Sequence, residues 1–348
     1  MQAPLPTLML VPTGIGCAIG GYAGDALPAA RLLAAASGCL ITHPNVMNGA
    51  SLYWCDERIH YVEGYGLDRF AAGDWGLAPV RSQRVGLLLD CGIEPELKQR
   101  HRQVADACRA TLGLSIGPVI ETDQPLDVTL ERGASGASWG KLGRPDALLR
   151  AGEKLQAAGA TAIAVVARFP DDVDSEALEA YRQGSGVDGL AGAEAVISHL
   201  LVQHLRIPCA HAPALSPLPL DPDLDPRAAA EELGYSFLSC VLVGLSRAPN
   251  LITSTRSRQL AELWMDQVEA LVVPEGALGG EAVLAALQHQ TPVIAVHNPS
   301  VLHVSSCALG VTDTVLPAAS YAEAAGLILA LREGLAPAAL RRPLEALS

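Results

Sequence analysis

Aromatic and basic residues are scarce in this chain of 348 residues, and this narrows the classes of protein it can be. Aromatic residues make up 4% of the sequence, although hydrophobic residues make up 50%. Ala, Leu, Val and Gly therefore fill the interior, which is typical of helices packed closely on sheets. The formal net charge is −13, and no run rich in Lys and Arg occurs. Because an acidic surface repels phosphate backbones and anionic lipids, we expect neither a nucleic-acid nor a membrane partner.

Paired cysteine motifs are also missing. The eight cysteines form no CxxC pair and no zinc-ribbon spacing, and several lie in apolar runs. Free cysteine in such runs behaves as a small buried hydrophobe, which argues for a reducing compartment. The N-terminus lacks the basic and apolar regions of a signal peptide, and no apolar run reaches the roughly 18–20 residues that span a bilayer. We therefore expect a cytoplasmic protein.

Several motifs of catalysis and nucleotide binding are absent as well. The sequence contains no Walker A loop, no GxSxG elbow and no HExxH pair. Gly14 and Gly16 lack the third glycine of a dinucleotide fingerprint at the required spacing. No cofactor and no metal can be named from a motif.

Apolar runs alternate with helical stretches along the chain, and this predicts an α/β fold with a mostly parallel sheet flanked by helices. The small residues of 122–144 predict a loop. We expect either two Rossmann-like lobes around a cleft, residues 1–168 and 169–348, or one composite domain. The predicted strands are 7–11, 40–42, 59–62, 85–89, 161–167, 271–273 and 291–296, and the predicted helices are 25–36, 94–112, 145–158, 193–205, 254–265 and 321–333.

One unit occurs three times: glycines, an acid in the first turn of a helix, a strand, and a histidine. Glycines permit tight turns and close approach of a ligand, and a helix N-terminus offers free N–H groups. A histidine at the carboxyl end of a strand faces the crevice where open α/β sheets bind ligands. The acids equally fit a structural role, because a carboxylate stabilises the positive end of a helix. In chain order the units contain Gly20, Gly21, Asp25, His43 and Asn45, then Glu194 and His211, then Gly279, Gly280, Glu281 and His297.

Two further stretches gather polar side chains suited to an anion. One follows the predicted strand at 59–62, and the other lies at 133–141. A guanidinium group contacts a carboxylate or phosphate with two hydrogen bonds, and phosphate loops use hydroxyl, amino and backbone N–H groups. A surface ion pair and a flexible loop are the structural alternatives. The residues concerned are Glu63, Asp68, Arg69, Ser135, Ser138 and Lys141.

The chain resembles a domain-of-unknown-function family best known from cyanobacteria. The resemblance is carried by residues 42–48 with 20–25 before them, by 61–70, by 135–140 and by 192–199, and it runs over nearly the whole chain. It implies a cytoplasmic, bacterial photosynthetic setting. It carries over no catalytic residue, because no activity is established for that family.

Polar residues at predicted strand ends favour an enzyme that acts on a small anionic metabolite by acid–base chemistry in a cleft between the lobes. Arg69, the two serines and Lys141 would hold the anion. A non-catalytic metabolite- or cofactor-binding protein is one alternative, and a metal-dependent hydrolase or lyase, which requires the histidines to converge, is another. Apolar helical surface in 321–348 favours a homo-oligomer. The acid–base candidates are His43, His211, His297, Glu63, Asp68, Glu194 and Glu281.

Overall fold

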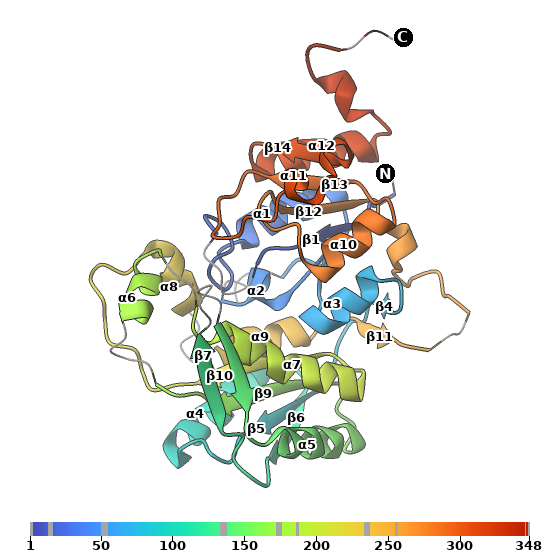
Figure 1. The fold of residues 1–348 in the computed structure, drawn as a ribbon. Coiled ribbons are helices and arrows are strands. Elements are labelled where there is room, and N and C mark those ends of the chain that lie inside the picture. Colours follow the sequence, from blue (N-terminus) through green and yellow to red (C-terminus); the bar gives the residue numbers. More distant parts are fainter. Residues whose placement is uncertain are drawn as a thin grey trace.

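Two parallel sheets, each with helices on both faces, form the protein (Figure 1). The expected α/β fold with parallel sheets flanked by helices is confirmed. The computed structural model describes residues 3–12, 17–49, 55–132, 138–171, 176–185, 188–232, 237–254, 257–344 and 346.

The larger sheet takes its strands from both ends of the chain. Its elements are β1 (Thr7–Met9), β2 (Leu40–Thr42), β3 (Ile59–Tyr61), β12 (Ala270–Pro274), β13 (Val293–Val296) and β14 (Val315–Ala318), with helices α1 (Leu27–Ser37), α3 (Gly64–Ala71), α10 (Glu281–Gln288) and α12 (Tyr321–Arg332). The strand order is β14-β13-β12-β1-β2-β3, and every neighbouring pair is parallel. Counted along the chain, this is the order 3-2-1-4-5-6 of a doubly wound sheet. The order therefore reverses between β1 and β12.

Strand β12 shows why these apolar runs become central strands. All of its residues are buried. Leu271 and Val273 pack in the core that includes α3 and α10, whereas Val272 packs in the core that includes α1 and α12. A parallel strand covered by helices on both faces needs an unbroken apolar run, which is what 270–273 supplies.

The smaller sheet is built from the segment between β3 and β12. It consists of β5 (Val85–Leu89), β6 (Ile116–Glu121), β9 (Ala162–Arg168) and β10 (Cys209–Ala214), with α4 (Pro95–Leu112), α5 (Pro145–Ala157), α7 (Ala191–Leu205) and α9 (Leu238–Leu245) around it. The order is β10-β9-β5-β6, all parallel. Helices α5 and α7 cover one face, and α4 and α9 the other. Because α9 belongs to the same apolar core as α1 and α12, one core connects the two sheets.

The remaining elements correct two predictions. They are α2 (Pro44–Met47), β4 (Gly76–Ala78), β7 (Val128–Arg132), β8 (Ser138–Leu142), α6 (Glu176–Arg182), α8 (Pro226–Glu232), β11 (Asn250–Ile252) and α11 (Ser306–Leu309), with 3-10 turns at 265–267, 312–314 and 337–340. The loop expected over 122–144 is wrong, because β7 and β8 form an antiparallel hairpin there. The helix expected over 254–265 is wrong for the described residues, because Leu263 pairs its backbone with Leu77 of β4 at 2.8 and 2.9 Å.

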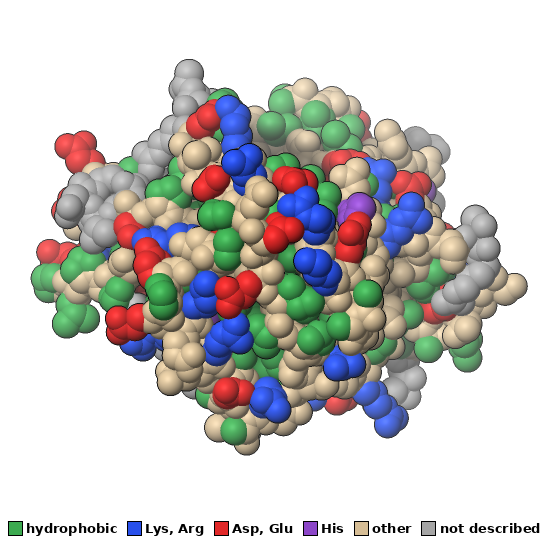
Figure 2. Space-filling model, turned by 90° about the horizontal axis from the view of Figure 1, so that it is seen from below, with side chains coloured by type: hydrophobic (Ala, Val, Ile, Leu, Met, Phe, Trp, Pro, Cys, Tyr) green, Lys and Arg blue, Asp and Glu red, His purple; other side chains and the backbone are tan. Residues whose placement is uncertain are grey.

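The expected division of the chain after residue 168 stays a prediction. In the structure this position falls between β9 and β10, which are neighbours in the smaller sheet. The outer face of that sheet's helices carries charges of both signs (Figure 2). The ion pairs Lys98–Glu121 and Arg150–Asp123 join α4 and α5 to β6 and the residues after it.

Candidate functional site

A cavity of about 510 Å³ lies where the strand order of the larger sheet reverses. Leu10 and Val11, which follow β1, and Ala277, which follows β12, form one part of its lining. Residues of α7 and β10 from the smaller sheet form another part. Open α/β sheets bind ligands outside the carboxyl ends of their strands at such a reversal, and a cavity of this size holds a small metabolite.

The first acid–base pair joins Glu63 to His199 across the cavity wall. Glu63 precedes α3, and its Oε2 accepts the backbone N–H groups of Tyr65 and Gly66 at 3.0 and 3.4 Å. Its Oε1 lies 3.2 Å from Nε2 of His199 on α7. Burial raises the pKa of Glu63 to about 8 and lowers the pKa of His199. The shifts favour a protonated carboxyl group beside a neutral imidazole near neutral pH.

The second pair places His211 beside Ser198 and Glu194. His211 lies inside β10, opposite Val165, and not after the end of the strand as predicted. Its Nδ1 hydrogen-bonds to Oγ of Ser198, and its Nε2 lies 3.6 Å from Oε2 of Glu194. Glu194 and Ser198 are one turn apart on α7, so both reach the same side of the helix. At the cavity wall, the two ring nitrogens of His211 thus face Ser198 and Glu194.

His43 is placed to donate a hydrogen bond to a ligand. Its Nε2 accepts the backbone N–H of Val11 at 3.1 Å, and the residue is 8% exposed. Burial lowers its pKa to about 4, so the ring is neutral with its proton on Nδ1. Among the described residues Nδ1 has no hydrogen-bond partner, and the side chain lines the cavity.

Glu231 adds a buried carboxyl group to the same wall. Its Oε2 accepts the hydroxyl of Tyr181 at 2.8 Å and the backbone N–H of Ala23 at 3.2 Å. Burial raises its pKa, and the neighbouring carboxylates of Asp188 and Glu194 raise it further. This part of the cavity is thus crowded with acidic groups.

Most of the predicted site residues meet at this cavity, although they come from segments far apart in the chain. The predicted residues that line it are His43, Asn45, Glu63, Asp68, Ser138, Glu194, His211, Gly280 and Glu281.

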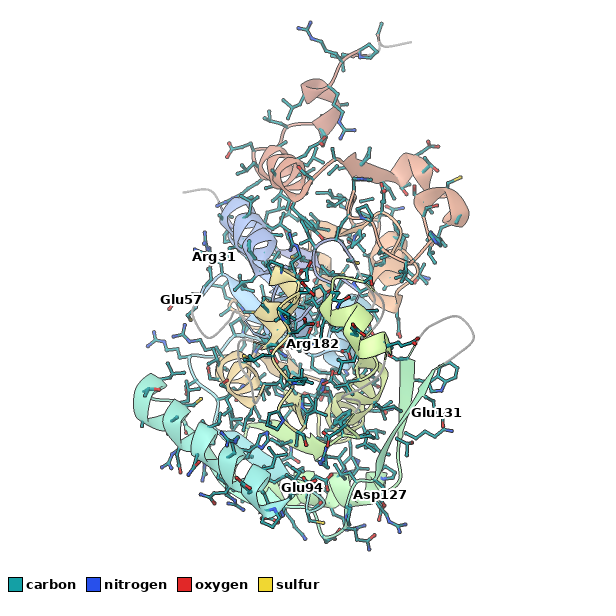
Figure 3. All side chains as sticks on the ribbon, turned by 90° about the vertical axis from the view of Figure 1, so that its left-hand side faces the viewer. Arg31, Glu57, Glu94, Asp127, Glu131 and Arg182 are labelled. Carbon is teal, nitrogen blue, oxygen red and sulfur yellow. The ribbon has the colours of Figure 1, made fainter. Side chains whose placement is uncertain are left out.

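Among the predicted residues that do not line the cavity are two on the surface and one outside the described part of the chain. The side chain of His297 is 62% exposed and pairs with Glu275 at 2.9 Å. Lys141 pairs with Glu131 at 2.6 Å on the outer side of the hairpin, and Figure 3 shows Glu131 at the edge of the molecule. Ser135 lies outside the described residues.

Arg69 and the first glycine turn have structural contacts. Arg69 bonds to Asp74 at 2.9 Å and also to Glu281, so its charge is already paired. Asp25 joins its turn to α8 through Arg227 at 3.2 Å. Gly20 has a φ of +95°. Neither Gly20 nor Gly21 nor Gly279 belongs to the described lining of the cavity.

The three similar units are not equivalent in space. The first and third are strand–helix–strand units of the larger sheet, and His43 and His297 directly follow β2 and β13. The second belongs to the smaller sheet, where His211 lies within β10.

Sequence reasoning missed four residues of the site: Ser198, His199, Asp188 and Glu231. Ser198 had a usable signal, because it follows Glu194 by one helical turn. His199 and Glu231 had none, because their partners Glu63 and Tyr181 are remote in sequence.

Within the described ranges, no group of three or more His, Cys, Asp or Glu side chains is arranged to hold a metal ion. The same part of the chain contains no helix with both the length and the apolar character needed to cross a bilayer.

Comparison with known proteins places the whole chain in one family. The profile of a family described as "protein of unknown function (DUF3326)" matches residues 6–341. An uncharacterized lipoprotein of Synechococcus sp. is 57% identical over 338 residues, which are 97% of this chain and 93% of that protein. No solved structure gives a significant match. The resemblance to a domain-of-unknown-function family of cyanobacteria is confirmed.

Proposed function

The chain belongs to the DUF3326 family of proteins of unknown function, and we propose that it is an enzyme that acts on a small metabolite by acid–base chemistry in the cavity between its two sheets. The observation that carries the proposal is the meeting of two imidazole–carboxyl pairs at the cavity, Glu63–His199 and Glu194–His211, each with one member on α7. Active sites are where burial and neighbouring charges shift pKa values toward the working pH.

Each group has a distinct role under this proposal. Glu63, with a pKa of about 8, is protonated at neutral pH and serves as the general acid. His211, held by Ser198 and Glu194, serves as the general base. His43 donates its Nδ1 proton in a hydrogen bond that polarises an oxygen of the substrate, as a neutral imidazole can.

The anionic character expected for the metabolite depended on Arg69, Ser135, Ser138 and Lys141. Of these, only Ser138 belongs to the described lining of the cavity. The described lining of the cavity therefore supports the acid–base chemistry and gives no support for an anionic ligand.

A first prediction tests the acid–base role. The protein and its His211→Asn variant are incubated with a cell extract, and metabolites consumed and formed are compared by mass spectrometry. We expect the variant to lose turnover by about 10²-fold or more, because a positioned base contributes that much.

The matched control is His204→Asn, a histidine on the surface of α7. His204 pairs with Glu153 at 2.7 Å on the surface and is remote from the chemistry. Equal turnover by wild type and His211→Asn would contradict the proposal. A ligand retained unchanged on long incubation, seen as extra mass in native mass spectrometry, would support a non-catalytic binding protein instead.

Location has a separate test. The eight cysteines are free in the structure, which supports the cytoplasmic location expected from the sequence. The name of the Synechococcus relative speaks for a lipid-anchored protein. Fractionation of cells that express the chain with its natural N-terminus distinguishes the two by recovery in the soluble or the membrane fraction.

A further inference from the structure

The cavity is lined by many acidic side chains. Among the described residues, no Lys or Arg side chain lines it. Lys and Arg are what proteins place around phosphate and carboxylate ligands. The acidic lining residues are Glu63, Asp68, Asp188, Glu194, Glu231 and Glu281.

The positions that an anion would take at the helix N-termini are occupied by the protein's own carboxylates. Glu63 accepts two N–H groups at the start of α3. Asp188 accepts the N–H of Leu190 at 2.8 Å just before α7. Asp68 accepts the N–H of Ala282 in the first turn of α10. The partial positive charge of each helix end is thus already used within the chain.

The nearby basic side chains are also committed. Arg69 is bonded to Asp74 and Glu281. Arg182, near the middle of Figure 3, bonds to Glu232 at 2.7 Å and lines a smaller cavity that adjoins this one at Asp188 and Glu231. An anionic ligand would therefore meet carboxyl groups without a free cation to offset them.

The part of the cavity wall around Glu231 instead favours a cationic ligand. Glu231 is in the field of Asp188 and Glu194, and burial leaves these groups poorly screened. A positive charge placed among them would be attracted by the carboxylates of Asp188 and Glu194 and would favour the ionised form of Glu231. The unpaired Nδ1 of buried His43 supplies the complementary donor for an oxygen, and aliphatic side chains such as Val273 complete the lining.

We propose that the ligand of this cavity is a small aliphatic amine, whose ammonium group lies among Asp188, Glu194 and Glu231. The inference rests on the proposed function in placing the substrate in this cavity. It adds the charge and the chemical class of the ligand.

The test uses three compounds of equal length that differ in charge: 1,5-diaminopentane, 1,5-pentanediol and glutarate. Each is titrated into the full chain by calorimetry, and each is added in a thermal-unfolding series. We expect the diamine to bind about tenfold or more tightly than the diol, and glutarate to bind least, because a buried charge pair discriminates at least this strongly. The order of thermal stabilisation should be the same.

Variants identify the wall responsible. Glu194→Gln and Glu231→Gln keep the shape of the side chain and should each weaken diamine binding about tenfold. Glu153→Gln, at a surface pair, is the control and should leave it unchanged. If Glu231→Gln does not fold, Glu194→Gln and the titration of the three compounds into the wild-type chain still test the proposal.

Tighter binding of glutarate, equal binding of the three compounds, or no binding at millimolar concentrations would each overturn the inference. Diamine affinity unaffected by Glu194→Gln would overturn it as well. These measurements need no turnover, so each of the two proposals can fail without the other. Selective diamine binding without turnover of any metabolite would contradict the proposed enzyme and support the amine ligand. Turnover of an anionic metabolite would support the enzyme and contradict the amine ligand.

Discussion

Glu63 performs two tasks with its two oxygens. One oxygen caps α3, and the other reaches His199 on a helix of the other sheet. The contact is possible because the next residue is Gly64, where an added Cβ would lie 2.9 Å from Nε2 of His199. A residue that would ordinarily be read as a helix cap thus also joins the two halves of the site.

The raised pKa of Glu63 predicts how stability depends on pH. The unfolded carboxyl titrates near 4.5 and the folded one near 8, so the folded chain binds the extra proton between these values. Its contribution to stability is complete below the unfolded pKa and is lost as the pH rises through the folded pKa. Glu63→Gln should therefore gain stability relative to the wild type as the pH rises from 4.5 to 8, measured by urea unfolding.

Glu269→Gln is the control for this series, because Glu269 is exposed on the surface. Its difference from the wild type should not change over the same pH range. A Glu63→Gln variant whose stability runs parallel to the wild type would show that the carboxyl group is ionised in the folded protein.

Ser198 positions His211 without contacting the substrate itself under our proposal. In Ser198→Ala the imidazole loses its Nδ1 partner, so the ring gains freedom to turn. We expect turnover to fall about tenfold or more while the fold is kept, because orientation of the base is lost but the base remains. The ring nitrogen signals of His211 in ¹⁵N NMR report the change of tautomer directly. Unaltered signals would show that Ser198 does not set the tautomer.

Among the elements, the β7–β8 hairpin depends on two glycines at its contact with α7, one on each side of that contact. A Cβ on Gly140 would lie 2.2 Å from the Cβ of Ala193, and one on Gly192 would lie 2.4 Å from the Cα of Trp139. The hairpin therefore packs directly on the first turn of α7, which lines the cavity. Gly192 belongs to one of the glycine-containing units that were expected to let a ligand approach. In the structure it lets β8 approach α7 instead.

Gly192→Val should push the hairpin away from α7. Over-packing of this kind costs about 1–3 kcal/mol, and we expect diamine or substrate binding to weaken with it. Urea unfolding measures the loss of stability, and a Trp fluorescence titration measures the weakening of binding. Gly326→Ala in α12 is the control, because no atom lies within 4 Å of the added Cβ and the change should be neutral or slightly stabilising. A Gly192→Val variant as stable as the wild type would refute the close packing.

The sequence predicted those elements whose own residues determine them. Runs such as 85–89 and 162–168 are apolar enough for buried parallel strands and were placed within a residue or two. The hairpin was missed because the small residues between 133 and 140 outweighed the alternation of apolar and polar residues in β7, which reads Val-Thr-Leu-Glu-Arg. The Glu63–His199 pair was missed because the fold, and no local pattern, brings α3 against α7.

At the scale of the whole molecule, the two sheets share one apolar core through α9. Leu242 of α9 is fully buried in this core. Leu242→Ala should cost about 2–5 kcal/mol and lower the stability of both sheets together. Hydrogen exchange in β1 and in β9 measures the two sheets separately.

Leu260→Ala is the control, because Leu260 is fully exposed and should tolerate the change. Destabilisation of β9 alone would show that the sheets unfold independently.

The order of the larger sheet also constrains how the protein is made. β1 pairs with β12 along Thr7–Met9 and Ala270–Val272, so one edge of the first strand lacks its neighbour until most of the chain has been synthesised. At about 5–20 residues per second, β1 emerges some tens of seconds before its partner. During that interval the apolar edge of β1–β3 is open to wrong pairing, and a nascent chain of this protein is a natural client for chaperones at the ribosome.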